Sequence, residues 1–505
     1  MSGNCGGGSR RWKLASTLAL AVLATACGTT VPRGEITQAG AGSSGLTNGA
    51  TPNAAQGGNA ITSGSEPGIP GATALGGPAV SPGGGPSTGV GASPASGPAG
   101  QIGPSAATGI GTGPIKIGAL TATGAGKYQR SLGFSGATGD QVAMTQAVVN
   151  YLNAHGGFGG RRIQLVSYDL NPTAVATDQS TAMQAACTFF TQDNKVAAIA
   201  SYVGLSPESF YQCLAKAHVP LVTPDEGLSS DFFQRYANTV YMPTAPNYTR
   251  LLSDSVEALW NAGWLTSKSN VGVVGYDTID VHAIVDKGLV PALQRHGLKL
   301  ATGMYTATTT QAASEYNAGV LSFKSRGVDR VFFAPGGQPV YFALAAEQQA
   351  YHPRYEVGSL EYPTPLAANL PADQLSGSMG LGWLPYLDLP SNKWPTVTTP
   401  GMAECRKAMA SANQNFSSGT TLGIAAWICD DWMFLRDAFA AATSADEAGI
   451  RRGAESLGEA FKPASTFGTS LSVGTTHDGA SGYRLIAFQG GCKCYSYTSA
   501  VNRLQ

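Results

Sequence analysis

The sequence predicts an α/β fold of two Rossmann-like lobes, each built on a parallel sheet, behind a signal peptide and a disordered linker. Short apolar runs alternate with helical patterns, and the alternation restarts at Asn270 after an irregular stretch near 241–248. Because parallel strands need a long crossover, usually a helix, these repeats indicate parallel sheets. Large apolar residues are almost missing from Gly28 to about Thr112, so we expect the folded part at 113–505.

Residues 1–26 are typical of an export signal. A basic segment precedes the uncharged run Leu14 to Ala26, which is too short to span a membrane. The run ends in Ala24-Thr25-Ala26-Cys27, which resembles a bacterial lipobox, so Cys27 is the predicted lipidation site. An ordinary cleaved signal is the alternative, and Arg10-Arg11 gives a weak twin-arginine likeness.

Residues 27–112 form the predicted disordered tether. They are mostly Gly, Ala, Ser, Pro and Thr, which cannot bury enough apolar surface to offset the entropy of ordering. A flexible segment of roughly 85 residues spans about 50 Å. The tether would therefore hold the folded part away from a membrane surface.

The first lobe is expected to begin with a strand at 115–120 and a Gly/Thr loop at 121–126. A helix with one apolar face follows from about Asp140, and Gly156-Gly157 ends it. Another helical pattern runs to about Asp193. Further strands are expected at 163–167, 196–200 and 219–223.

The second lobe repeats this order. Strands are expected at 271–274, 298–302 and 328–334, and helices at 283–296, 312–326 and 339–350. In open α/β sheets, ligands bind outside the carboxyl ends of the strands. Two such sheets facing each other predict a ligand cleft between the lobes.

Three segments, in order, carry a family resemblance: NAHGGFGGRRIQLVSYD at 153–169, HVPLVTPDEG at 218–227 and KSNVGVVGYD at 268–277. Together they resemble the type I periplasmic binding proteins, whose best-known member is the leucine/isoleucine/valine-binding protein of ABC importers. The resemblance covers about residues 114 to 490. It implies two lobes joined by a three-strand hinge.

The resemblance places the hinge crossings near Thr244, Tyr362 and Thr466. Lobe one would then comprise about 113–243 plus 363–465. Lobe two would comprise about 244–362 plus 466–505.

The resemblance also implies ligand contacts in loops after the strands. In lobe one these fall on Thr121, Thr123, Gly124, Ser201, Tyr202, Ser206, Thr223, Asp225 and Glu226. In lobe two they fall on Tyr276, Asp277, Gln338, Glu361 and Tyr362. The serine hydroxyls suit a carboxylate or carbonyl, and Glu361 lies near the position of the family's acid that pairs with a ligand ammonium.

Asp225 and Glu226 stand where the family usually has small residues and a Ser or Thr. Facing the cleft, two desolvated carboxylates would repel a ligand carboxylate by several kcal/mol. They would then favour a neutral, cationic or amide ligand. Facing solvent or capping the next helix, they leave a branched or aromatic amino acid compatible with the loop.

Six of the eight cysteines lie in the folded part, and an even number in an exported chain favours disulfides. We expect Cys187–Cys213 and Cys405–Cys429, each closing a loop of roughly 25 residues. Cys492 and Cys494 either bridge across one residue or stay reduced.

The composition excludes several classes of function. A net charge of zero and a charged fraction of 12% give no footprint for nucleic acid. No CxxC pair exists and the six histidines are scattered, so neither metal nor cofactor is expected. No G-x-S-x-G elbow is present, and Gly124 to Tyr128 lacks the residues of a phosphate loop.

The sequence therefore predicts a non-enzymatic, monomeric binding component of an ABC-type importer, lipid-anchored to the outer face of the cell membrane. It would capture a small molecule, such as an amino acid, an amide or a related polar compound, by hinge closure and then dock on a membrane permease. The alternative is a ligand-sensing module that signals to a membrane partner without transport.

Overall fold

The computed structural model describes residues 112–127, 138–204, 206–224, 227–306, 312–336, 338–396, 398–467 and 477–504. The predicted leader, Cys27 and the tether up to residue 111 lie outside these ranges, as do Asp225 and Glu226.

Lobe one contains a five-stranded parallel sheet in the order β2-β1-β3-β4-β5. Its strands are β1 (Ile115–Thr121), β2 (Ile163–Asp169), β3 (Ala198–Ser201), β4 (Leu221–Val222) and β5 (Val240–Tyr241). β1 pairs in register from Ile115 opposite Ile163, and nearly all of its side chains are buried, as expected for a central parallel strand. The predicted parallel arrangement is confirmed.

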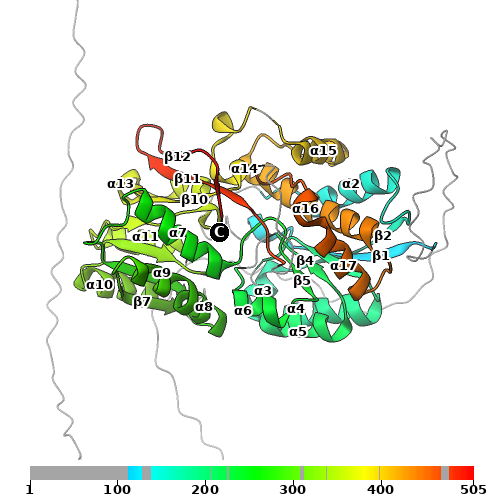
Figure 1. The fold of residues 1–505 in the computed structure, drawn as a ribbon, viewed down its shortest axis with the longest axis horizontal. Helices are drawn as coiled ribbons and strands as arrows, with labels where there is room; N and C mark the ends of the chain where they lie inside the picture. Colours follow the sequence, from blue (N-terminus) through cyan, green and yellow to red (C-terminus); the bar gives the residue numbers. More distant parts are fainter. Residues whose placement is uncertain are drawn as a thin grey trace, which may run out of the picture. The chain divides into compact units, whose positions relative to one another are not determined.

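Helices cover both faces of this sheet (Figure 1). One face carries α2 (Gln141–Ala154), α15 (Pro400–Ala408), α16 (Gly419–Ala441) and α17 (Glu447–Leu457). The other carries α3 (Pro172–Thr177), α4 (Gln179–Thr188), α5 (Glu208–Ala217) and α6 (Ser230–Arg235). Helix α2 begins where the Asp140 side chain accepts from the Ala143 amide, a standard N-cap.

Lobe two contains a four-stranded parallel sheet in the order β7-β6-β8-β9. Its strands are β6 (Val271–Tyr276), β7 (Leu300–Thr306), β8 (Arg330–Phe333) and β9 (Arg354–Tyr355). Its helices are α7 (Tyr248–Asn261), α8 (Ile279–Ile284), α9 (Val290–Arg295), α10 (Ala312–Ser325) and α11 (Pro339–Gln348). The alternation predicted for this lobe is confirmed.

The helix expected at 283–296 is interrupted. Helix α8 passes into a π-helical turn at Val285–Leu289 before α9 begins. Pro291 stands in the first turn of α9, and proline cannot donate the i→i−4 hydrogen bond. The wider turn accommodates this missing donor.

A third, antiparallel sheet completes lobe two and was not predicted. It pairs β10 (Met379–Gly382), β11 (Gly482–Gln489) and β12 (Cys494–Tyr497), with β13 (Asn502–Arg503) on β11. An isolated bridge between Glu356 and Met379 joins it to the end of β9. The last part of the chain thus returns to lobe two, as the resemblance implies.

One segment differs from the expected lobe boundary at Tyr362. Helices α12 (Pro363–Asn369) and α13 (Ala372–Leu375) were expected in lobe one, but Leu366, Leu370 and Leu375 pack in the apolar core of lobe two. Tyr362 has a φ of 53°, a left-handed turn before α12. The chain crosses between the lobes at the short α14 (Pro385–Asp388), where Tyr386 packs in the lobe-one core and the following Leu389 still packs in the lobe-two core.

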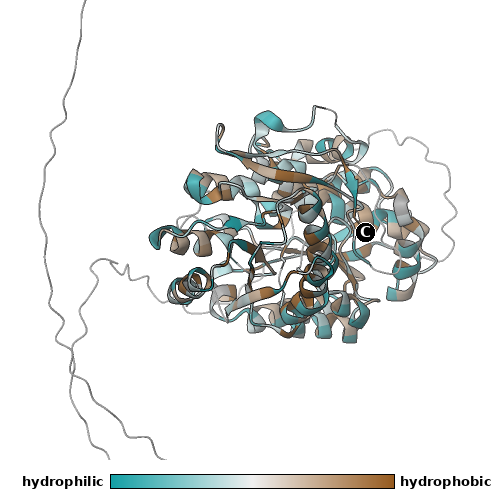
Figure 2. Cartoon of the chain, turned by 60° about the vertical axis from the view of Figure 1, so that its left-hand side comes forward, coloured by the Kyte–Doolittle hydropathy of each residue, from teal (hydrophilic) through white to brown (hydrophobic). Residues whose placement is uncertain are grey.

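Three apolar clusters hold the fold. One lies under α2, α15, α16 and α17, and one joins α10, α11 and α12 to the antiparallel sheet. The third runs from α4, α5 and α6 of lobe one to α7, α8 and α9 of lobe two. In Figure 2 the hydrophobic colour gathers on the strands and the inward faces of the helices.

Candidate functional site

The loop after β1 is fastened to the end of β2. Thr121 Oγ1 donates to Asp169 Oδ1 (2.7 Å), and the amide and hydroxyl of Thr123 donate to the two oxygens of the same carboxylate (2.9 and 2.5 Å). A Cβ on Gly124 would lie 3.0 Å from Pro172. The two predicted threonine ligands therefore serve Asp169 in this structure, a role that the sequence analysis did not anticipate.

The loop after β3 is closed by its own serine. Ser201 is fully buried, and its hydroxyl accepts from the Val203 amide and donates to the Val203 carbonyl, both at 3.1 Å. Ser206 follows just before α5. Thr223 is also fully buried, and its amide donates to the Tyr241 carbonyl (3.0 Å). Polar groups thus gather at the carboxyl ends of the lobe-one strands, as expected.

Three aromatic residues, Tyr202, Trp427 and Tyr362, form a contact group that we call the aromatic triad. Tyr202 follows β3, Trp427 lies in α16, and Tyr362 precedes α12. Both tyrosine ring centroids lie 6.3 Å from that of Trp427, within the range of favourable aromatic pairs. The structure therefore brings two predicted ligand residues onto one tryptophan.

Trp427 is a candidate site residue that the sequence analysis did not name. It is 3% exposed, and among the described residues its indole N–H has no hydrogen-bond partner. Buried indole N–H groups usually have one. The available signal was a tryptophan in the middle of an apolar helix, but helical spacing alone does not show which face meets a ligand.

The predicted lobe-two residues lie at the ends of β6 and before α11. Burial raises the pKa of Tyr276, and its hydrogen bond with Gln338 partly opposes that rise. The Gln338 amide donates to the Tyr316 hydroxyl (3.0 Å), and Asp277 Oδ1 lies 2.9 Å from His282 Nε2. Tyr276 and Gln338 are thus brought together, whereas Asp277 contacts its own helix.

Glu361 is buried beside a second acid. Its Oε2 accepts from the Gly358 amide (2.8 Å), and its Oε1 accepts from the Tyr248 hydroxyl (3.3 Å). Burial, together with the neighbouring Glu361 charge, raises the pKa of Glu356 well above its ordinary value. In this structure the Glu361 carboxylate is hydrogen-bonded to α7 and to its own turn and is buried. It is therefore shielded from a ligand ammonium that arrives from solvent.

Two ion pairs connect the lobes between α6 and the α8 region. Arg235 Nη2 lies 3.0 Å from Asp280 Oδ1, and Lys287 Nζ lies 2.5 Å from Asp231 Oδ2. These pairs could not be predicted from the sequence, because each joins residues more than 40 positions apart that only the fold brings together.

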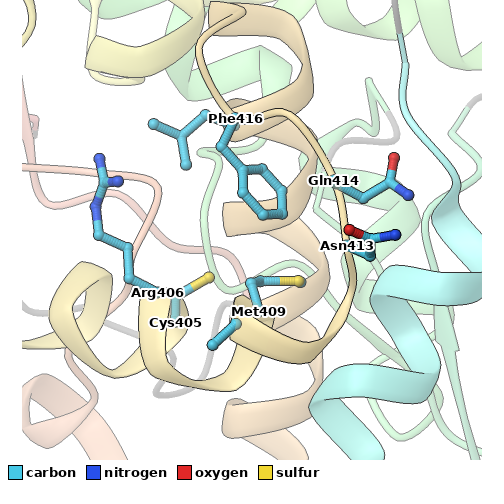
Figure 3. A pocket seen from close by; sticks show the side chains of 8 residues that line it. Cys405, Arg406, Met409, Asn413, Gln414 and Phe416 are labelled. Carbon is cyan, nitrogen blue, oxygen red and sulfur yellow. The ribbon is translucent and has the colours of Figure 1, made fainter.

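A separate pocket of about 330 Å³ opens on lobe one between α15 and the start of α16 (Figure 3). Phe416, Asn413 and Gln414 come from the connecting loop, and Cys405 and Arg406 come from α15. None of the predicted ligand residues lines it. The pocket is therefore distinct from the aromatic triad.

Three disulfides are present among the described residues. Cys187 joins Cys213 (S–S 1.97 Å), Cys405 joins Cys429 (2.03 Å), and Cys492 joins Cys494 (2.06 Å). These are the two expected pairs and the bridged alternative for the last two cysteines.

Within the described ranges, no helix is long and apolar enough to cross a membrane. Over the same ranges, no three His, Cys, Asp or Glu side chains gather as a metal site.

A family model described as "Periplasmic binding protein" matches residues 114–492. The chain belongs to the periplasmic binding protein family. The match covers the two lobes and the antiparallel sheet as far as the β11–β12 turn, and this part of the chain has the type I fold of the family. No curated protein sequence matches the chain.

Solved structures share the fold at low identity. The chain resembles an ABC transporter substrate-binding protein from Desulfitobacterium hafniense, with a TM-score of 0.52, 13% identity, and coverage of 76% of this chain and 100% of that one. It also resembles the branched-chain amino acid transporter substrate binding protein LivJ from Streptococcus pneumoniae, in complex with isoleucine. The TM-score is 0.52, the identity is 14%, and the match covers 77% of this chain and 99% of LivJ. A leucine binding protein, LivK, from Thermotoga maritima matches with a TM-score of 0.54 and 15% identity, over 77% of this chain and 99% of LivK.

Proposed function

We propose that this periplasmic binding protein is the extracytoplasmic substrate-binding lipoprotein of an ABC-type importer and that it captures a small molecule without catalysis. The aromatic triad is the observation that supports this most strongly. Its buried indole N–H lacks a partner in the described part of the chain. An unsatisfied buried donor costs about 1–3 kcal/mol, and a ligand oxygen that accepts from it removes that cost.

The triad favours a ligand with an apolar or aromatic portion beside a carbonyl or carboxylate oxygen. Aromatic faces pack on such a portion, and the indole N–H donates to the oxygen. Amino acids, amides and related polar compounds all meet this description. Asp225 and Glu226 distinguish among these ligands if they face the cleft, because their charges would then disfavour a ligand carboxylate. If they face solvent, a branched or aromatic amino acid fits as well.

Hinge closure provides the mechanism of capture. A ligand that touches both lobes binds the closed state more tightly, and this difference in affinity shifts the equilibrium toward closure. The α6–α8 ion pairs join the two lobes directly and favour arrangements in which α6 and α8 stay in contact. The closed protein then docks on a permease, while the lipid on Cys27 and the tether keep it near the membrane.

A thermal-shift screen of the purified full chain against the amino acids and their amides tests this function. A probe at about 100 times its dissociation constant should add about 2.7 kcal/mol of stability. The Asp225→Ala/Glu226→Ser variant should bind carboxylate probes more tightly if these acids face the ligand. If no probe shifts the melt and native mass spectrometry finds no retained small molecule, the proposed function is wrong.

A further inference from the structure

The turn between β11 and β12 carries the disulfide Cys492–Cys494, which closes a loop across a single residue. Cys492 is exposed and Cys494 is 8% exposed. In contrast, Cys187, Cys405 and Cys429 are almost fully buried between helices. A Cβ on Gly490 or Gly491 would meet no atom within 4 Å, so the turn before Cys492 stands open.

A lysine lies against the exposed sulfur. Lys393 Nζ is 3.5 Å from Cys492 Sγ and donates to Ser496 Oγ at 2.6 Å. The next residue, Trp394, is anchored on its other side, because its indole donates to the Leu389 carbonyl (3.1 Å) and packs on Tyr386. An ammonium at this distance stabilises a thiolate and lowers the pKa of the thiol that carries it.

This disulfide contributes little to the stability of the fold. In the chain-entropy model, the stabilisation by a crosslink grows with the logarithm of the loop that it closes. The other two disulfides span 26 and 24 residues, whereas this one spans 2. Opening it frees almost no additional chain, and the β11–β12 pairing that flanks it is held by its own ladder.

We propose that Cys492–Cys494 is a thiol–disulfide exchange site that external dithiols reduce in the folded protein. A thiolate of the dithiol attacks Cys492 Sγ, the accessible sulfur, and the S–S bond breaks with its electron pair on Cys494 Sγ, which takes up a proton. The second thiolate of the dithiol then attacks the dithiol sulfur that is bonded to Cys492 Sγ. This closes the disulfide of the dithiol and expels Cys492 as a thiolate. The chain gains two electrons as two thiols, and the dithiol becomes a disulfide.

Lys393 acts on the second step. The leaving group there is the Cys492 thiolate, and a thiol with a lower pKa leaves faster. Lys393 is thus a positioning residue for this exchange. The same contact favours the thiolate of Cys492 once the pair is reduced.

Peptide mapping of the folded full chain tests the proposal. Aliquots are treated with dithiothreitol, a small dithiol, or with reduced thioredoxin, a protein dithiol, and free thiols are trapped with iodoacetamide over time. Cys492 and Cys494 should become labelled at least about tenfold faster than the other four cysteines. Labelling by both reductants indicates a site open to proteins, and labelling by dithiothreitol alone restricts the exchange to small dithiols.

Two lysine variants separate exchange chemistry from mere exposure. Lys393→Gln should slow alkylation of reduced Cys492 near neutral pH by about tenfold and move its pH midpoint upward. Lys493→Gln removes a charge between the two cysteines but not the 3.5 Å contact, and it should change the rate less. Free Cys492 and Cys494 before reduction, equal labelling of all six cysteines, or equal effects of both variants would overturn the proposal.

Discussion

Arg235 and Asp280 join the two lobes through one guanidinium nitrogen. Arg235 Nη2, at the end of α6, lies 3.0 and 3.1 Å from the two carboxylate oxygens of Asp280, in the first turn of α8. Ser229 Oγ donates to the same carboxylate at 2.8 Å while it caps α6. The carboxylate therefore couples the start and the end of a lobe-one helix to lobe two.

Breaking this contact should loosen lobe closure more than it destabilises either lobe. Arg235→Gln with Asp280→Asn in a double-mutant cycle should give a coupling free energy of only about 0.5–1 kcal/mol, since both side chains keep partial contact with solvent. Small-angle X-ray scattering should nevertheless report a larger radius of gyration for Arg235→Gln. The matched control is Arg451→Gln, which breaks an ion pair inside α17 and should leave the radius unchanged.

Replacing Trp427 separates a ligand contact from a packing role. Trp427→Phe keeps an aromatic ring between Tyr202 and Tyr362 but removes the buried, unpartnered N–H. The melting temperature without ligand should stay the same or rise, because an unsatisfied donor disappears. Affinity for a ligand found in the screen should fall about tenfold by calorimetry, the equivalent of one hydrogen bond.

The control for this substitution is Trp432→Phe, in the same helix, where the indole packs near Phe158. It should lower the melting temperature and leave the affinity unchanged. If Trp427→Phe destabilises the protein without ligand to the same extent and binds the ligand as well as wild type, Trp427 serves packing alone.

The sequence predicted the parallel sheets because strand and helix patterns alternate over long stretches, and this periodicity is the primary local signal of secondary structure. It did not predict β10 to β13. Strands β10 and β11 pair with each other although they lie about 100 residues apart in the sequence, so no local turn motif marks their pairing. The interruption of the helix before Pro291 could have been predicted from the sequence, since proline lacks the N–H donor that a continuous helix needs.

Side-chain partners were harder to predict than loops. The resemblance predicted Thr121 and Thr123 as ligand contacts in the loop after β1, but only the fold shows that Asp169 accepts hydrogen bonds from both hydroxyls. Trp427 remained hidden because its two tyrosine neighbours come from distant segments. The local sequence pattern predicts where a residue lies along a strand or helix. Which hydrogen-bond or packing partner its side chain meets depends on segments that are distant in the sequence.

Cys27 should carry the lipid anchor, although it lies outside the described residues. Cys27→Ser should release the protein from the membrane fraction or leave its leader uncleaved, because the acylated sulfur is lost. Membrane fractionation and intact mass measure both outcomes. Cys5→Ser is the matched control, since Cys5 precedes the apolar run and should be removed with it. A Cys27→Ser protein that remains membrane-bound at the wild-type mass would contradict lipidation.

Asp388 should make the protein less stable as the pH rises from about 4 to about 7. Burial raises the pKa of Asp388 to about 7, although Tyr497, Ser359 and the Leu384 amide all donate to its Oδ2. The unfolded chain releases this proton near pH 4 while the folded chain keeps it. Unfolding therefore becomes easier by roughly 1.4 kcal/mol for each unit between the two pKa values.

The Asp388→Asn variant tests this. It can keep the accepting oxygen, and it should reduce the loss of unfolding free energy between pH 5 and pH 8 in urea unfolding. Asp430, whose pKa burial raises to about 7, and Glu356, whose pKa burial also raises, should sustain the remainder. The exposed Asp373→Asn control should keep the full wild-type slope. Parallel slopes for wild type and Asp388→Asn would show that Asp388 is ionised in the fold throughout this range.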